Sequence, residues 1–93
     1  MSEKKVTVTV RSGMISVDPE SIQVIKEHDH VRWVCDSGEF TIDMPGFKVD
    51  HLRENGKHHG VSGTFPTLGK IKYNVSAPNA ETLDPEVEVI PVG

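Results

Sequence analysis

The clearest pattern in the chain is the alternation of apolar and polar residues across positions 30–44. It breaks once, at Asp36-Ser37-Gly38, and then resumes. A period of two with a glycine-containing break is typical of paired strands that bury one face. This segment therefore predicts a hairpin with the only tryptophan, Trp33, in the core. The positions predicted to point inward are Val31, Trp33, Cys35, Phe40, Ile42 and Met44.

Shorter alternating runs on both sides of this hairpin predict further strands. They cover positions 6–10, 14–17, 21–26, 64–68, 71–75 and 87–89. Pro66 confines the run at 64–68 to a sheet edge, because proline cannot donate to a strand ladder. Positions 47–54 predict one helical turn. The glycine-rich stretch 55–63 predicts a loop, the most mobile part of the chain.

The number and spacing of these elements predict the fold class. Seven or eight short strands separated by turn residues are typical of an all-β sandwich. A chain of 93 residues is long enough for one hydrophobic core but not for two. We therefore expect one domain over residues 1–93, folded as a Greek-key β-sandwich.

Charge and composition exclude several classes of partner. The net charge is −4, and lysine and arginine are not clustered, which argues against nucleic-acid binding. No apolar run approaches the roughly 18 residues that a membrane span requires. One cysteine excludes an internal disulfide, and the first residues lack the apolar run of a signal peptide. A cytoplasmic location is expected, with the periplasm as the alternative if a signal peptide has been removed.

The order of the strands and turns resembles the cupredoxin family over nearly the whole chain. That resemblance implies a cupredoxin-like sandwich. The landmarks that carry it are Val17-Asp18-Pro19, Val31-Arg32-Trp33, Phe40-Thr41-Ile42, Gly69-Lys70-Ile71-Lys72-Tyr73 and the valine-rich run 87–89.

The same resemblance locates where a type 1 copper ligand set would lie. In that family, copper is held by a histidine after the first hairpin turn and by a Cys-x-His-x-Met-like cluster after the Gly-x-x-x-Tyr strand. A thiolate, two imidazoles and a weak axial sulfur form this site. Here Phe40 stands at the histidine position and Val75 near the cysteine position, and 76–86 contains no histidine, cysteine or methionine. We expect no type 1 copper and no other cofactor.

The remaining reactive side chains form no convincing constellation. Cys35 points inward and has Asp36 beside it, so it is interpreted as a small core residue rather than a reactive thiol. The segment 60–63 lacks the Gly-x-Ser-x-Gly spacing of a nucleophile elbow. The histidines could hold copper or zinc, but their spacing is a weak signal, and solvated turns are the favoured explanation. They are His28, His30, His51, His58 and His59.

The sequence therefore predicts a non-catalytic binding or interaction module, with no catalytic, cofactor-binding or metal-binding residue assigned. The alternative is a metal-handling protein that uses the loop histidines. Recognition of a protein or small ligand is expected at one end of the sandwich, where loops 36–39 and 76–84 should meet. Phe40 and Val75 would form an apolar contact patch there, flanked by Pro78 and Leu83. Alternatively, Phe40 and Val75 are buried core residues. The sequence leaves the oligomeric state open.

Overall fold

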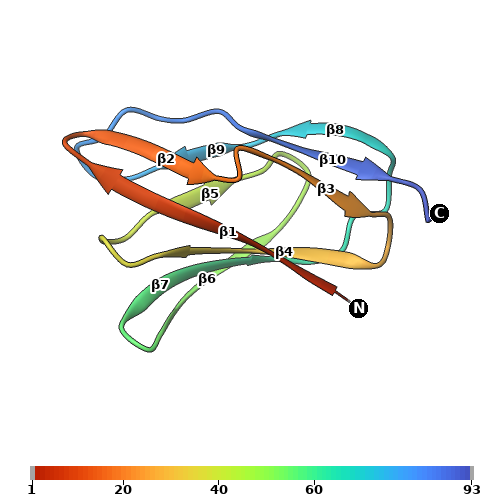
Figure 1. Ribbon diagram of the computed structural model, residues 1–93, viewed down its shortest axis with the longest axis horizontal. Coiled ribbons are helices and arrows are strands. Elements are labelled where there is room, and N and C mark those ends of the chain that lie inside the picture. Colours follow the sequence, from red (N-terminus) through yellow and green to blue (C-terminus); the bar gives the residue numbers. More distant parts are fainter. Residues whose placement is uncertain (1, 93) are drawn as a thin grey trace.

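The computed structural model describes residues 2–92, and within them it shows ten β-strands. They run along a molecule with extents of 40 × 26 × 21 Å (Figure 1). The strands are β1 (Ser2–Arg11), β2 (Met14–Asp18), β3 (Ser21–Ile25), β4 (Asp29–Cys35), β5 (Thr41–Asp43), β6 (Val49–Glu54), β7 (Lys57–Ser62), β8 (Gly69–Lys72), β9 (Asn74–Ser76) and β10 (Glu86–Ile90).

One layer is a five-stranded sheet with the order β2-β1-β4-β7-β6. β4 lies at its centre, parallel to β1 and antiparallel to β7. In β4 every second residue is buried and the residues between them are partly exposed. The period of two in the sequence therefore arises because one face of this sheet packs on the core.

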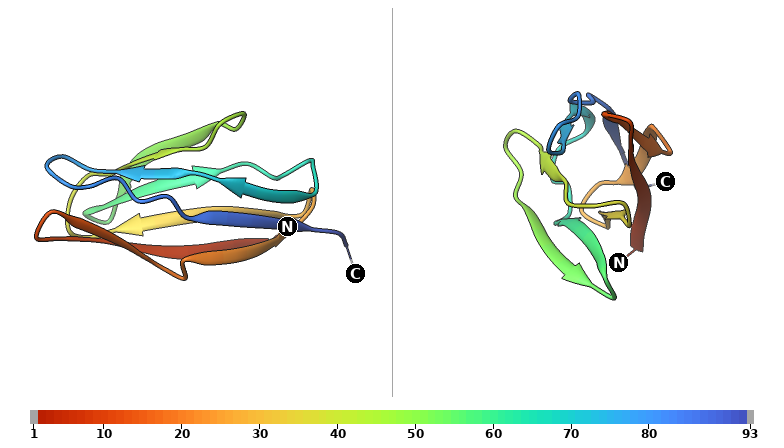
Figure 2. Two further views of the ribbon diagram at one scale, coloured as in Figure 1. Left: turned by 90° about the horizontal axis from the view of Figure 1, so that it is seen from above. Right: turned by 90° about the vertical axis from the view of Figure 1, so that its left-hand side faces the viewer.

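The second layer consists of two small sheets. β3, β10 and β8 form one, and β5 and β9 form the other. β8 and β9 follow one another along the same line, on either side of Tyr73 (Figure 1). The Tyr73 amide donates to Pro85 O at 3.1 Å, so the backbone at this break is also paired. Seen from the side and the end, the two layers face each other across the core (Figure 2).

Trp33 joins the two layers. It lies on β4, is 0% exposed, and its Nε1 donates a hydrogen bond to the Tyr73 hydroxyl at 3.0 Å. The two rings pack edge to face with centroids 5.2 Å apart. Burial raises the pKa of the Tyr73 phenol, and the hydrogen bond from Trp33 opposes that rise. The predicted position of Trp33 in the core is confirmed, as is the burial of the other inward positions: Val31, Cys35, Phe40, Ile42 and Met44.

The prediction that 30–44 forms a hairpin is wrong. β4 and β5 belong to different sheets, since β4 pairs with β1 and β7 while β5 pairs with β9. The break at Asp36-Ser37-Gly38 carries the chain from one layer to the other. Alternation specifies which face of a strand is buried and leaves its hydrogen-bonding neighbour unspecified. Both strands point their apolar residues into the same core from opposite layers.

The predictions for 47–54 and 55–63 are also wrong. These segments form the hairpin β6–β7, which closes through Asn55 and Gly56 with φ of 55° and 74°. Positive φ at both turn residues is the type I′ geometry that Asn-Gly favours in two-residue hairpins. The sequence signal was therefore present. The irregular polarity of the two strands obscured it.

Positions 64–68 form no strand. The segment is nevertheless fixed, because Phe65 is 0% exposed and packs on Phe47, with centroids 5.3 Å apart. Its carbonyl accepts a hydrogen bond from the Glu27 amide at 2.8 Å. The part of the chain that the structure describes has no helix long and apolar enough to cross a membrane.

Candidate functional site

Four connections lie together at one end of the sandwich, at the left in Figure 1. This surface is called the loop end and is defined by residues 11–13, 36–40, 55–56 and 77–85. They link β1 to β2, β4 to β5, β6 to β7 and β9 to β10. Each connection departs from a paired strand, so the loops are held on a rigid frame.

Hydrogen bonds between the connections fix their relative positions. The Val10 amide donates to Ser37 Oγ at 3.1 Å, and the Glu81 amide donates to Gly13 O at 3.0 Å. Thr41 pairs with Ser76 across β5 and β9. Residues 39–41 and 76–78 together line a shallow hollow. The prediction that loops 36–39 and 76–84 meet at one end is confirmed.

Of the two alternatives for Phe40 and Val75 at this end, core burial is confirmed and the apolar contact patch is not. Phe40 is 6% exposed and Val75 is 0% exposed, so both are core residues. Residues 77–85 cover Val75, whose amide donates to Leu83 O at 2.8 Å. Leu83 itself packs on the core. Burying these side chains leaves polar and charged groups at the tips of the loops, because apolar surface is more stable out of water.

The exposed side of the loop end is acidic. Its connections carry Asp36, Glu39, Glu81 and Asp84, against the single basic residue Arg11. All five residues are exposed to solvent. Asp84 is paired with Lys72 of β8 at 3.4 Å, so the excess negative charge of this end comes from Asp36, Glu39 and Glu81. A surface of this kind attracts positively charged partners and raises the rate at which they arrive.

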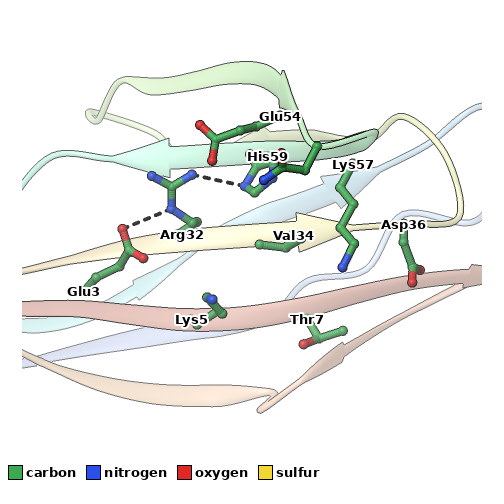
Figure 3. A pocket seen from close by; sticks show the side chains of 10 residues that line it. Glu3, Lys5, Thr7, Arg32, Val34, Asp36, Glu54, Lys57 and His59 are labelled. Atoms are coloured by element: carbon green, nitrogen blue, oxygen red, sulfur yellow. Dashed lines mark hydrogen bonds and ion pairs between the residues drawn. The ribbon is translucent and has the colours of Figure 1, made fainter.

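A hollow of 530 Å³ opens on the outer face of the five-stranded sheet and extends to the loop end (Figure 3). This sheet hollow lies over β1, β4, β7 and β6. It has three acidic and three basic side chains, so it is close to neutral, with Val34 and Thr7 between them. Its charged lining residues are Glu3, Asp36, Glu54, Lys5, Arg32 and Lys57.

Arg32 organises the polar groups of the sheet hollow. Its Nε donates to Glu3 at 3.0 Å and its Nη1 donates to His59 Nδ1 at 3.1 Å (Figure 3). A guanidinium can only donate, so His59 Nδ1 accepts and the ring proton resides on Nε2. Hydrogen bonds from His30 and Arg32 lower the pKa of the Glu3 carboxyl. These contacts hold the Arg32 plane across three strands.

The sequence did not identify this group of residues. The parallel pairing of β1 with β4 places Glu3 beside His30, with Arg32 two residues further along β4. The antiparallel pairing of β4 with β7 places His59 opposite Val34. Alternation predicts that Arg32 points outward, but only the strand order reveals which charges lie next to it.

The five histidines do not form one cluster. His30 contacts Glu3, His59 contacts Arg32, and His51 Nε2 accepts a hydrogen bond from the Ile42 amide at 3.0 Å. Among residues 2–92, no three histidine, cysteine, aspartate or glutamate side chains are grouped as a metal ion would need. The structure therefore gives no support to metal handling by the loop histidines, His58 included.

Hydroxyl and thiol groups are occupied in structural contacts. Ser62 is 6% exposed, accepts a hydrogen bond from the Val31 amide and donates to Gly63 O. It lies in β7 and not on a strand-to-helix elbow. Cys35 is 0% exposed, with Sγ 3.3 Å from Ser37 Oγ. Neither side chain is placed to attack a substrate.

Comparison with known proteins finds a likeness to a solved structure. No protein-family model and no curated protein sequence matches this chain. Among solved structures, it is similar to the crystal structure of EhICP2, a cysteine protease inhibitor from Entamoeba histolytica. The TM-score is 0.61, the sequence identity is 11%, and the match covers 96% of each chain. At this identity the likeness shows a shared all-β fold.

Proposed function

We propose that this protein is a non-catalytic protein-binding module that recognises its partner through the loop end. The carrying observation is the set of four connections at one end of a rigid sandwich, three of which are tied to one another by hydrogen bonds. The exposed side chains of Asp36, Glu39 and Glu81 lie outside the core and in none of the strands. Recognition by loops on a rigid frame is the usual arrangement in β-sandwiches.

The partner class is proposed from the structural likeness. A protein that shares this fold over 96% of its length is a cysteine protease inhibitor. An inhibitor acts by binding and needs no reactive group of its own, which agrees with the structural roles of Ser62 and Cys35. Cysteine proteases are therefore the first partners to test, and the acidic loop end favours those with a basic surface beside the active-site cleft.

Purified protein should slow substrate turnover by at least one member of a panel of cysteine proteases and leave serine proteases unaffected. Glu39→Lys combined with Glu81→Lys should weaken that inhibition by at least about tenfold, which is about 1.4 kcal/mol. Both positions are exposed at the loop end, so the fold should persist. Inhibition constants at low and moderate ionic strength provide the measurement.

Glu27→Lys is the matched control, because Glu27 is exposed in the turn between β3 and β4, at the opposite end of the molecule (Figure 1). It makes the charge change of one of the two substitutions, away from the loop end, and should leave inhibition nearly unchanged. Equal weakening by the control would reject the loop end as the recognition surface. Failure to bind any cysteine protease would reject the partner class.

We also propose that the cupredoxin resemblance concerns the sandwich frame and not its metal chemistry. The two positions matched to copper ligands carry the buried apolar residues Phe40 and Val75. Cys35 lies in the other layer, on β4, and is closed to solvent. Added Cu(II) should therefore produce no intense blue thiolate-to-copper absorption band. An intense band that disappears in Cys35→Ser would contradict both the matched positions and this proposal.

A further inference from the structure

β6 is the longest strand at any outer edge of the two layers, with six residues, and five of them are exposed. It borders the five-stranded sheet beside β7, and the β6–β7 hairpin extends away from the rest of the molecule (Figure 2). The second layer contacts β6 through a side chain, because the His51 ring accepts a hydrogen bond from the Ile42 amide of β5. Among residues 2–92, β6 pairs with β7 alone, and no strand lies along its other edge.

The register of the hairpin determines which backbone groups this edge presents. Glu54 and Lys57 flank the two-residue turn, so they form a hydrogen-bonded pair. Hydrogen-bonded and non-hydrogen-bonded pairs alternate along an antiparallel ladder. The amide and carbonyl groups of Val49, His51 and Arg53 consequently point away from β7. They form a row of unused donors and acceptors of the kind that pairs with another strand.

We propose that β6 pairs antiparallel with β6 of a second copy of this chain, about a two-fold axis at His51. Residues opposite each other in a continuous sheet must point to the same face, so only a few registers are possible. With the axis at His51, the residues whose backbone groups point away from β7 would pair across the interface. Val49 of each copy would lie opposite Arg53 of the other, and the two His51 residues would lie opposite each other. The two five-stranded sheets would join into one continuous sheet through a symmetric interface, to which both copies contribute the same surface.

The charges on β6 favour this register over its neighbours. With the axis at His51, Lys48 of each copy faces Glu54 of the other, giving two opposite-charge pairs on the outer face. Shifting the axis to Asp50 would place Asp50 against Asp50, and shifting it to Leu52 would place Asp50 against Glu54. Like charges directly opposite one another destabilise a strand pair, whereas opposite charges stabilise it.

The other edges lack this self-complementarity. β8 carries Lys70 and Lys72, which would face each other in an antiparallel pair centred on Ile71. β2 and β3 carry no pair of opposite charges. In β6, by contrast, the charged side chains favour the register centred on His51 and oppose the registers centred on Asp50 and Leu52. They would favour a closed dimer over an open fibre.

Leu52 gives a further reason for a second copy to cover this edge. It is 38% exposed, on the same face as Glu54. In the proposed register the two Leu52 side chains lie diagonally across the axis, at a separation of about 7–8 Å between the backbones. Pairing would therefore remove an exposed apolar group from water on each copy, in addition to joining the backbone groups.

The test is the solution mass of the full chain, measured by sedimentation at increasing concentration. The wild type should approach twice its 10.3 kDa mass, and added salt should shift it toward the monomer. Lys48→Glu alone and Glu54→Lys alone should each weaken the dimer, because each places like charges opposite one another. The double variant should restore the wild-type mass. Lys70→Glu on β8 makes the same type of change at another edge and should leave the mass unchanged.

Amide hydrogen exchange locates the interface independently. Val49, His51 and Arg53 should become protected as the concentration rises, while Asp50 and Leu52 are already protected in the monomer by pairing with β7. A chain that remains monomeric up to millimolar concentration would overturn the proposal. So would a dimer that both single variants leave intact. Protection of these three amides only after adding a different protein would assign the edge to that partner and also overturn it.

Discussion

Trp33→Ala is expected to destabilise the protein by about 3–5 kcal/mol, the usual cost of truncating a large core aromatic residue. The indole is 0% exposed and connects the two layers through its contact with Tyr73. Truncation removes its packing on both layers and leaves the Tyr73 hydroxyl without its donor. Domains of this size are typically stable by about 5–15 kcal/mol, so the loss would be a large share of the total. Denaturant unfolding followed by far-UV circular dichroism measures it.

Tyr73→Phe separates the hydrogen bond from the packing. It retains the ring and removes only the oxygen that accepts the Trp33 Nε1–H group. Leaving that buried donor unsatisfied should cost about 1–3 kcal/mol, clearly less than the loss of the whole indole. Tryptophan emission in the wild type should be that of a buried indole. Emission typical of full solvent exposure, or a Trp33→Ala variant as stable as the wild type, would contradict the central position of Trp33.

Local alternation was sufficient to identify the residues that fill the core between 30 and 44. The period of two is a property of the extended backbone, so it correctly assigned Trp33 and Phe40 to the buried side whichever strands lie next to them. The pairing partners depend on how distant segments pack, and that information is not local. β4 and β5 were therefore assigned to one hairpin although they belong to opposite layers.

The β6–β7 hairpin was missed because its strands lack the pattern that a buried face produces. β6 is exposed on both faces, so polar residues are tolerated at nearly every position. In β7 an inward position is occupied by Gly60, where a Cβ atom would lie 3.4 Å from Ile42 and 3.5 Å from Val49. A Cβ atom would make ordinary contacts at those distances, so the pattern is obscured because glycine supplies no apolar side chain where alternation would place one. The Asn55-Gly56 turn was the remaining local signal.

The candidate site was predictable in position but not in chemistry. Loops that follow paired strands at one end of a sandwich can be located from the order of elements, and 36–39 and 76–84 do meet. Whether Phe40 is exposed there depends on long-range packing, such as its contact with the His51 ring of β6, which no local pattern records. The Arg32 contacts likewise require the strand order of the sheet.

Phe65→Ala is expected to cost about 3–5 kcal/mol, although Phe65 lies in a segment without regular structure. The ring is 0% exposed and packs on Phe47, and the Phe65 carbonyl binds the Glu27 amide across the end of the sandwich opposite the loop end. The side chain therefore anchors the connection from β7 to β8, and its removal would leave a cavity that the rigid strands on either side cannot close. Leu68→Ala is the control in the same segment, because Leu68 is 51% exposed and should change the unfolding free energy by less than about 0.5 kcal/mol. Equal effects of the two variants in denaturant unfolding would show that Phe65 is not the anchor. A large loss of unfolding free energy confined to Phe65→Ala would establish that burial of one side chain, without strand pairing, fixes this connection.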